Sequence, residues 1–144
     1  MSDQKPICKV LSDDAKQWRL NGKLHRVDGP AVEYTNGNKR WFLNGKLHRV
    51  DGPAVEYVNG DKEWYLNGKC HRVDGPAFED ADGSKHWFLN HKYHRVDGPA
   101  IERANGTKEW WLNNKNCKPI EVFKAATHEQ RIHMLCFYAS EFMP

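Results

Sequence analysis

Four histidines in this chain are each followed by an arginine and, two residues further on, by an aspartate. A histidine next to a carboxylate can act as a general base that the carboxylate orients, and several histidines together could bind a metal ion. The copies are alike, whereas an active site needs one asymmetric pocket, and no serine or cysteine stands at a matched position as a nucleophile. We therefore expect no catalytic residue, no metal site and no cofactor. The residues concerned are His25, His48, His71 and His94, Arg26, Arg49, Arg72 and Arg95, and Asp28, Asp51, Asp74 and Asp97.

A structural role explains the same residues better, because every stacked unit of a repeat protein needs the same contacts to its neighbours. The aspartate of each Asp-Gly-Pro can accept hydrogen bonds from backbone N–H groups of its own turn. The histidine can donate to that aspartate or to a carbonyl. The arginine can bridge to a glutamate further along, and such side-chain ladders fix the register between strands. The glutamates are Glu33, Glu56, Glu79 and Glu102.

These residues belong to a repeat with a period of 23 residues, marked by Trp18, Trp41, Trp64, Trp87 and Trp110. A fixed period of this length is typical of repeat architectures. One such unit cannot bury its apolar side alone, so neighbouring units must stack. We assign residues 16–118 to the repeats, residues 1–15 to a lead-in and residues 119–144 to a C-terminal cap.

Each repeat contains two turn signals, which predict antiparallel hairpins. One is Asn-Gly, as at Asn44-Gly45, and the other is Asn-Gly or Asp-Gly, as at Asn59-Gly60. Both suit two-residue turns in which the two central residues have positive φ. Six residues, 61–66, separate turns on one side and thirteen, 46–58, on the other, so the surplus must leave the ladder. Val-Asp-Gly-Pro is where it can do so, because proline has no N–H for the ladder.

The predicted fold is therefore an all-β repeat protein with a small helical cap. Its repeats form either an antiparallel hairpin meander, in which equivalent residues lie two strands apart, or a β-solenoid, in which they stack at the strand spacing of about 4.8 Å. The strands we expect are Lys-x-His-Arg and Ala-Val-Glu-Tyr, with a corner between them.

Alternation along the strands assigns their faces, with the Trp and Leu positions placed in the core. The column between them begins with Arg19, so we expect it to be half-exposed, either packed or covered by the C-terminal segment, or used as a binding surface. The later repeats diverge most, which favours their end as an interface. The candidate binding residues are Phe42, Tyr65, Phe88, Trp111, His91, Tyr93 and Arg103.

The two ends of the chain differ from the repeats. Residues 7–11 are predicted to form an edge strand that pairs with residues 17–20. Residues 120–126 can form a short helix, and Thr127-x-x-Gln130 is a capping-box pattern that starts another. The side chains of Ile132, Leu135, Ala139 and Phe142 then fall close to one helical face, so a helical cap on the open end of the sheet is expected.

Composition places few limits on function. The formal net charge of +3 and the interleaved acidic residues fall short of the clustered basic surface of a nucleic-acid domain. The chain has no apolar run that could span a membrane, and its polar first residues lack the apolar segment of a signal peptide, so we expect a cytoplasmic protein. The cysteines have no paired spacing, and Cys70 stands where other copies have Leu or Tyr, so we interpret it as an apolar filler.

The period, the Asn-Gly-Lys-x-His step and the Asx-Gly turn resemble the MORN repeat family, which forms β-sheets from hairpins. The chain departs from that family in having arginine after each histidine. The fuller pattern, Trp-x-Leu-Asn-Gly-Lys-x-His-Arg-x-Asp-Gly-Pro-Ala, is similar to a group of repeat proteins of phages and large viruses. This resemblance implies a viral origin and a non-catalytic binding role, without membrane contact.

Two functions are compatible with these patterns. One is a protein-binding module, a viral adaptor or inhibitor that acts on a host protein in the host cytoplasm. The other is an anion-binding protein for nucleic acid or a nucleotide. In that case the arginines and a column of lysines would bind phosphates and the aromatic residues would stack on bases. The lysines are Lys39, Lys62, Lys85 and Lys108.

Overall fold

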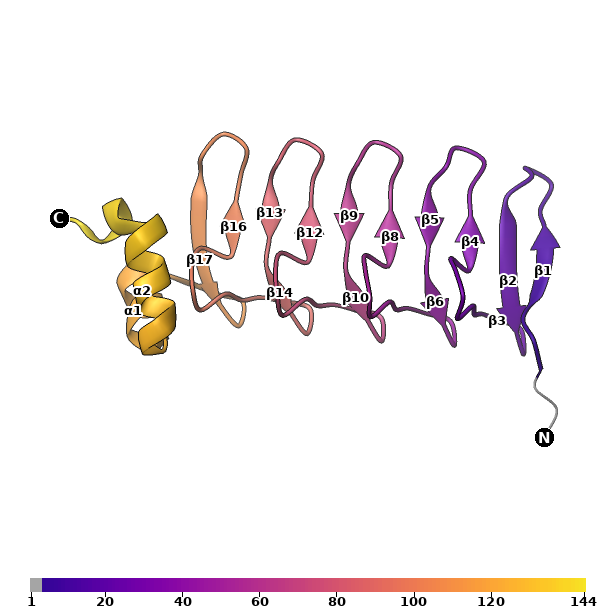
Figure 1. Ribbon diagram of the computed structural model, residues 1–144, viewed down its shortest axis with the longest axis horizontal. Helices are drawn as coiled ribbons and strands as arrows, with labels where there is room; N and C mark the ends of the chain where they lie inside the picture. Colours follow the sequence, from indigo (N-terminus) through magenta and orange to yellow (C-terminus); the bar gives the residue numbers. More distant parts are fainter. Residues whose placement is uncertain (1–3) are drawn as a thin grey trace. The chain divides into compact units, whose positions relative to one another are not determined.

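The computed structural model describes residues 4–144. The chain forms two compact units, of which one ends at Cys70 and the other begins at His71. Both consist of short antiparallel hairpins, and the second unit ends in helices (Figure 1). The strands of the first unit are β1 (Ile7–Val10), β2 (Lys16–Leu20), β3 (Lys23–Leu24), β4 (Val32–Glu33), β5 (Lys39–Arg40), β6 (Phe42–Leu43), β7 (Lys46–Leu47), β8 (Val55–Glu56), β9 (Lys62–Glu63), β10 (Tyr65–Leu66) and β11 (Lys69–Cys70). The second unit comprises β12 (Phe78–Glu79), β13 (Lys85–His86), β14 (Phe88–Leu89), β15 (Lys92–Tyr93), β16 (Ile101–Glu102), β17 (Lys108–Leu112), β18 (Lys115–Cys117), α1 (Pro119–Ala125), α2 (His128–Phe137) and the 3-10 helix η1 (Ala139–Phe142).

The main sheet of each unit is a hairpin meander. In the first unit its strand order is β1-β2-β4-β5-β8-β9, and in the second β12-β13-β16-β17-β18. Strand β5 pairs antiparallel with β4 before it and with β8 after it. Equivalent strands of successive repeats, such as β4 and β8, therefore lie two strands apart, which selects the meander over the solenoid. The all-β hairpin fold with a helical cap is confirmed.

A smaller hairpin, here called the side hairpin, follows the main-sheet strands in each repeat. The side hairpins pair β2 with β3, β6 with β7, β10 with β11, and β14 with β15. Their turns have positive φ at both central residues, 50° at Asn44 and 78° at Gly45, as the Asn-Gly signal predicts. The looser Asn90-His91 turn keeps this geometry, with φ of 49° and 67°.

The turns of the main-sheet hairpins differ from the prediction. Only the glycine has positive φ, 94° at Gly37, and the Gly37 N–H donates to Tyr34 O at 3.0 Å while Tyr34 N–H donates to Asn38 O. This is a three-residue loop closed by a bulge at glycine. The Asn36 side chain accepts from Asn38 N–H instead of Asn36 adopting positive φ itself. A two-residue turn is wrong here because the register pairs Glu33 with Lys39 and leaves one residue too many.

The corner is confirmed at Val-Asp-Gly-Pro, which belongs to no strand in the described repeats. The preceding strand is shorter than predicted, because β7 ends at Leu47. The backbone hydrogen bonds continue beyond it, since His48 N–H donates to Trp41 O and Arg49 N–H donates to Tyr65 O of the next repeat. The tightest packing lies directly after the corner, where Ala54 and Val55 are fully buried.

The tryptophan column is less buried than the sequence predicts. Trp41 and its neighbours Trp18, Trp64 and Trp87 are half-buried, and Trp110 is 3% exposed because helices cover it. In the second unit the aromatic column packs against rings of the same and of neighbouring repeats. Phe88 is buried against Phe78 and Tyr93, with ring centroids 5.2 and 4.1 Å away. Cys70 is buried as a filler, and burial raises the pKa of its thiol to about 12.

The terminal elements form largely where expected. The edge strand β1 pairs with β2, with Ile7 opposite Arg19. Helix α1 starts at Pro119, and α2 starts after Thr127, whose side chain accepts from Gln130 N–H in a capping box. None of the helices among residues 4–144 is long and apolar enough to cross a membrane.

The predicted apolar face of the C-terminal segment is wrong for Ile132 and Leu135, whereas Phe142 packs against the core as expected. Ile132 and Leu135 are each 51% exposed, whereas Met134 is fully buried. Met134 packs with Trp110 and Val122. The side of the helix that carries Met134 faces inward because it covers Trp110. His133 and Tyr138 face the loop around Arg95, where they bond to Asp97 and Glu102. Ile132 and Leu135 face outward as a result.

Candidate functional site

The corner loops hold the arginine ladder, which we call the Arg-Val-Asp-Gly loops (residues 26–29, 49–52, 72–75 and 95–98). Within the loop, Arg49 Nε donates to Asp51 Oδ1 at 3.0 Å. Its Nη1 donates to Pro53 O at 3.1 Å and to Glu56 Oε1 at 2.9 Å. Arg26, Arg72 and Arg95 make the corresponding contacts, so the predicted arginine–glutamate bridge is confirmed. The aspartate was predicted to accept hydrogen bonds from backbone N–H groups of its own turn. Its main hydrogen-bond donor is instead the arginine two residues before it.

In three of these loops the guanidinium group stacks on a tryptophan ring. The Cζ of Arg49 lies 4.0 Å from the centroid of the Trp41 ring, and Arg26 and Arg95 cover Trp18 and Trp87 in the same way. On the other side, a Cβ atom at Gly52 would lie 2.9 Å from Arg49 Cζ. The absence of a Cβ therefore allows the close approach of the guanidinium, which an alanine would displace from its contacts; the bend does not call for glycine, because its φ is not positive.

The histidines tie successive repeats together through the side-hairpin turns. Asn67 N–H donates to His48 Nδ1 at 3.0 Å, and the same contact joins Asn44 to His25, Asn90 to His71 and Asn113 to His94. The predicted bond to aspartate or a carbonyl is wrong. Because a backbone N–H can only donate, Nδ1 must be unprotonated and the neutral imidazole carries its proton on Nε2. Burial lowers the pKa of His94, which favours the same neutral form.

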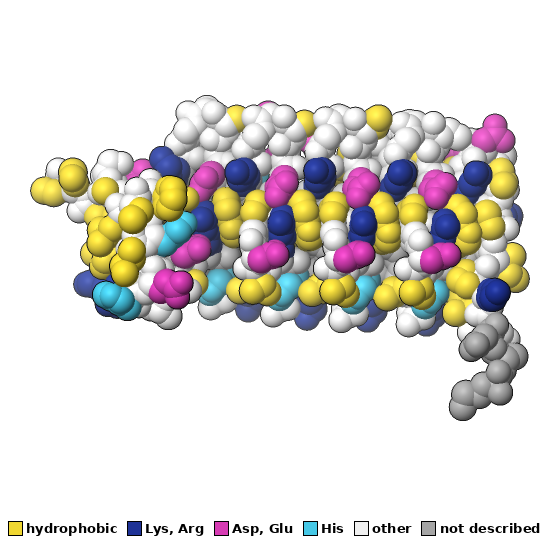
Figure 2. All heavy atoms as spheres, viewed as in Figure 1, with side chains coloured by type: hydrophobic (Ala, Val, Ile, Leu, Met, Phe, Trp, Pro, Cys, Tyr) yellow, Lys and Arg dark blue, Asp and Glu magenta, His cyan; other side chains and the backbone are white. Residues whose placement is uncertain are grey.

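Between two successive loops of the first unit lies a groove, here called the Trp41 groove. Its volume is about 660 Å³, and Trp41 and Leu43 line it between the two loops. The walls carry exposed apolar side chains, since Val27 is 80% and Val50 82% exposed. Exposed apolar side chains that gather beside a tryptophan can mark an interaction site. Figure 2 shows rows of acidic, basic and apolar side chains that recur on this face.

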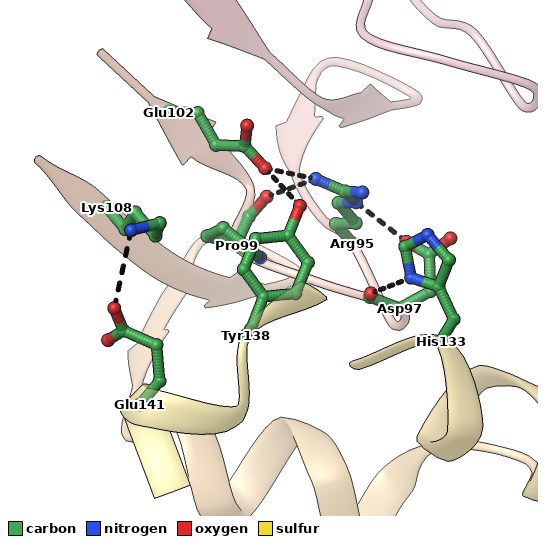
Figure 3. A network of polar contacts seen from close by, with 8 residues as sticks. All are labelled: Arg95, Asp97, Pro99, Glu102, Lys108, His133, Tyr138 and Glu141. Carbon is green, nitrogen blue, oxygen red and sulfur yellow. Dashed lines mark hydrogen bonds and ion pairs between the residues drawn. The ribbon is translucent and has the colours of Figure 1, made fainter. Parts of the chain in front are cut away.

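The loop around Arg95 has the same residues but is covered by the C-terminal helices (Figure 3). His133 Nδ1 lies 3.0 Å from Asp97 O and must donate to it, because a carbonyl can only accept. Tyr138 donates to Glu102 Oε1 at 2.5 Å, and burial raises the pKa of this phenol to about 12. The side chain of Asp97 is 42% exposed, compared with 85% for Asp28.

The loops are close to neutral or slightly acidic. Each guanidinium contacts two carboxylates, one from the loop and one from the following strand. The hydrogen bond and charge of the arginine lower the pKa of Asp28, Asp51 and Asp74. These aspartates are therefore ionised at neutral pH, and Asp28 and Asp51 form an exposed acidic rim around the apolar floor of the Trp41 groove.

Three of the predicted binding residues lie together in the second unit, because the ring centroid of Tyr93 is 4.1 Å from that of Phe88 and 5.7 Å from that of Trp111. Phe42 and Tyr65 are half-buried on side hairpins, and Trp111 donates from its indole N–H to Glu109 at 3.1 Å. His91 is exposed in a side-hairpin turn. Arg103 is exposed on the main-sheet hairpin formed by β16 and β17, and pairs with Glu109. The structure does not bring His91 and Arg103 together.

Sequence reasoning missed three residues that shape this surface: Val27, Val50 and Tyr138. The valines stand inside the repeated motif, and their exposure follows from the corner, which turns the side chain away from both sheets. The signal for Tyr138 was the loss of the pattern at Lys118, which stands where the other copies have arginine. Trp110 therefore has no arginine of its own, and the C-terminal helices cover it instead.

Comparison with models of known protein families found no match for this chain, and a search among curated proteins found no match either. The MORN-like kinship remains a prediction from the repeated motif.

Proposed function

We propose that this chain is a non-enzymatic protein-interaction module that binds a partner through the grooves between its Arg-Val-Asp-Gly loops. The observation that carries the proposal is the Trp41 groove, an apolar floor between walls that expose Val27 and Val50. Interface cores combine aromatic and aliphatic contacts with a polar rim. The exposed Asp28 and Asp51 supply such a rim here.

The state of the arginines favours a protein partner over an anion. A phosphate would have to displace both carboxylates from a guanidinium that they already hold at 2.9–3.0 Å, as at Arg49. The exposed aspartates would also repel it. The histidines are engaged as hydrogen-bond acceptors between repeats, which supports a structural role in place of acid–base catalysis.

The origin and partner belong to the same proposal. The repeated motif is of the kind found in proteins of phages and large viruses, so we propose a viral adaptor or inhibitor whose partner is a host protein in the host cytoplasm. A MORN-like hairpin repeat suits this role because it presents the same loop at regular intervals on a rigid scaffold.

The proposal is tested by affinity capture from host lysate at physiological salt with wild type, the double variant Val27→Glu/Val50→Glu and the control Val58→Glu. Val58 is 71% exposed but lies beside a main-sheet turn, away from the groove. We expect a stoichiometric protein that wild type and Val58→Glu retain and the double variant loses. A partner that binds all three chains equally would overturn the proposal.

A nucleic-acid titration distinguishes the proposed protein-binding function from the alternative, an anion-binding function. Binding of single-stranded and duplex DNA and RNA is measured at two salt concentrations, because affinity carried by phosphate contacts falls steeply as salt rises. We expect no specific binding. A steep salt dependence that Val27→Glu/Val50→Glu does not alter would support an anion-binding function instead.

A further inference from the structure

The C-terminal segment shows what kind of side chain an Arg-Val-Asp-Gly loop can accept. Tyr138 donates its hydroxyl proton to Glu102 at 2.5 Å (Figure 3). Its ring meets Trp110 edge to face, with centroids 5.7 Å apart. Its Cε2 lies close enough to Gly98 that a Cβ atom there would stand 2.9 Å away. The Cζ of Arg95 lies 5.7 Å from the ring centroid. The phenol is thus held by one carboxylate, one indole, one glycine and one guanidinium.

Three of these four groups recur in the lining of the Trp41 groove, and the fourth, a glutamate, recurs at the matching position of the repeat, bound to the arginine of the lining. Arg26, Gly29 and Trp41 line the groove, and Glu33 is bound to Arg26 as Glu102 is bound to Arg95. The side chain of Glu33 is 35% exposed and that of Arg26 21%, compared with 27% and 10% in the covered copy. The volume of the Trp41 groove, about 660 Å³, lies within the range of about 300–1,000 Å³ that ligand pockets occupy.

The Tyr138 site and the Trp41 groove differ in one respect. Trp110 has no arginine over it, whereas Arg49 covers Trp41 at 4.0 Å. An aromatic ring in the Trp41 groove would therefore lie between the guanidinium groups of Arg26 and Arg49. Guanidinium groups attract the face of an aromatic ring, so the second wall adds a partner for the ring.

Building on the proposed function, we propose that the Trp41 groove binds a tyrosine side chain that a segment of the partner protein presents. The phenol occupies the groove as Tyr138 occupies its own site, and its hydroxyl donates to Glu33. The charges of the loop favour a neutral hydrogen-bond donor. The carboxylates of Asp28 and Glu33 can accept a hydrogen bond from a hydroxyl group, and they repel an anion. A phosphorylated tyrosine is therefore excluded, because its phosphate would face both carboxylates.

The test is a titration of the full chain, followed by amide and indole NMR signals, with three probes: N-acetyl-tyrosinamide, N-acetyl-phenylalaninamide and the O-phosphorylated tyrosine compound. We expect the tyrosine probe to shift the signals of Gly29, Val50 and the Trp41 indole. The phenylalanine probe should bind about tenfold more weakly, as a lost hydrogen bond to a charged acceptor implies. The phosphorylated probe should not bind the groove.

Two variants complete the test. Val50→Glu should abolish the shifts by placing a charge on the groove wall, whereas Val58→Glu should leave them unchanged. Equal binding of the tyrosine and phenylalanine probes, stronger binding of the phosphorylated probe, or shifts that survive Val50→Glu would overturn the inference. If the tyrosine probe fails while capture of the partner still depends on Val27 and Val50, the ligand chemistry is wrong and the interaction module stands. If capture does not depend on them, the proposed function itself fails.

Discussion

The loop around Arg49 and the loop around Arg95 are built from the same residues, yet one faces solvent and the other is covered by the chain itself. In both, the arginine stacks on a tryptophan and bridges the loop aspartate to a strand glutamate. At Arg95 the helices add Tyr138 and His133 to this framework without rearranging it. The loop therefore holds its shape without a partner and is ready to accept one, which is how a preorganised binding surface keeps the entropy cost of binding low.

Alanine in place of the loop glycine should have the largest effect and should distinguish the two loops. At Gly98 the new Cβ would stand 2.8 Å from Arg95 Cζ and 2.9 Å from Tyr138 Cε2, whereas at Gly52 only Arg49 is this close. We expect Gly98→Ala to lower the free energy of unfolding by about 3 kcal/mol and Gly52→Ala by about 2 kcal/mol, as overpacking does. Denaturant unfolding measures both. Equal, small losses would show that the guanidinium does not need the glycine.

Removal of the Tyr138 hydroxyl group should lower the stability of the covered loop around Arg95 and leave the open loops unchanged. Tyr138→Phe loses the hydrogen bond to Glu102 and should cost about 1.5–2 kcal/mol, the usual value of a bond to a charged group. The measurement is the free energy of unfolding in a double-mutant cycle with Glu102→Gln. If the two changes are additive, the phenol and carboxylate are not coupled and Tyr138 is no guide to the ligand of the open groove.

These contacts mark how far the sequence alone could reach. The Asn-Gly pairs predict the side hairpins because two adjacent left-handed residues suit few other structures. The ladder from Arg49 to Glu56 was also predictable, since both lie in one copy of the motif. The bond from His48 to Asn67 was not, because it joins residues of different repeats and depends on how one hairpin lies on the next.

The cap was harder to predict for a similar reason. Helix α2 has apolar residues on more than one side, so periodicity alone could not show which side faces the repeats. The orientation of the helix is set by Met134, which packs against Trp110. It is also set by His133 and Tyr138, which hydrogen-bond to Asp97 and to Glu102. The exposed Ile132 and Leu135 follow from these contacts.

Replacement of a repeat histidine should have a smaller effect on stability. His48→Ala leaves Asn67 N–H without its acceptor and should cost about 1 kcal/mol, near the lower end for a lost hydrogen bond at a half-exposed site. His48→Asn should recover part of the loss, because its Oδ1 can accept in place of Nδ1. Because His48 also lines the Trp41 groove, the free energy of unfolding and not partner binding is the readout of this contact. An unchanged free energy of unfolding in His48→Ala would show that the hydrogen bond to Asn67 does not stabilise the repeats.

The pH dependence of His94 should be the smallest effect. Burial lowers the pKa of His94 in the folded chain below its ordinary value of 6.5, so the unfolded chain takes up a proton more readily. The stability that His94 contributes is therefore complete above pH 6.5 and is lost as the pH falls through the folded pKa. Thermal unfolding from pH 7.5 downward should show this loss, and His94→Asn should reduce it. A slope unchanged by the substitution would show that other groups cause it.

The central claim is that the open copies of the loop are a protein-binding surface, and the most direct test is the affinity of the captured partner for three chains. The dissociation constants of wild type, Val27→Glu/Val50→Glu and Val58→Glu are compared at physiological salt. Two charges buried at an apolar contact should weaken binding by more than tenfold, and the same change at Val58 should leave affinity within a factor of two. Unchanged affinity of the double variant would contradict the account.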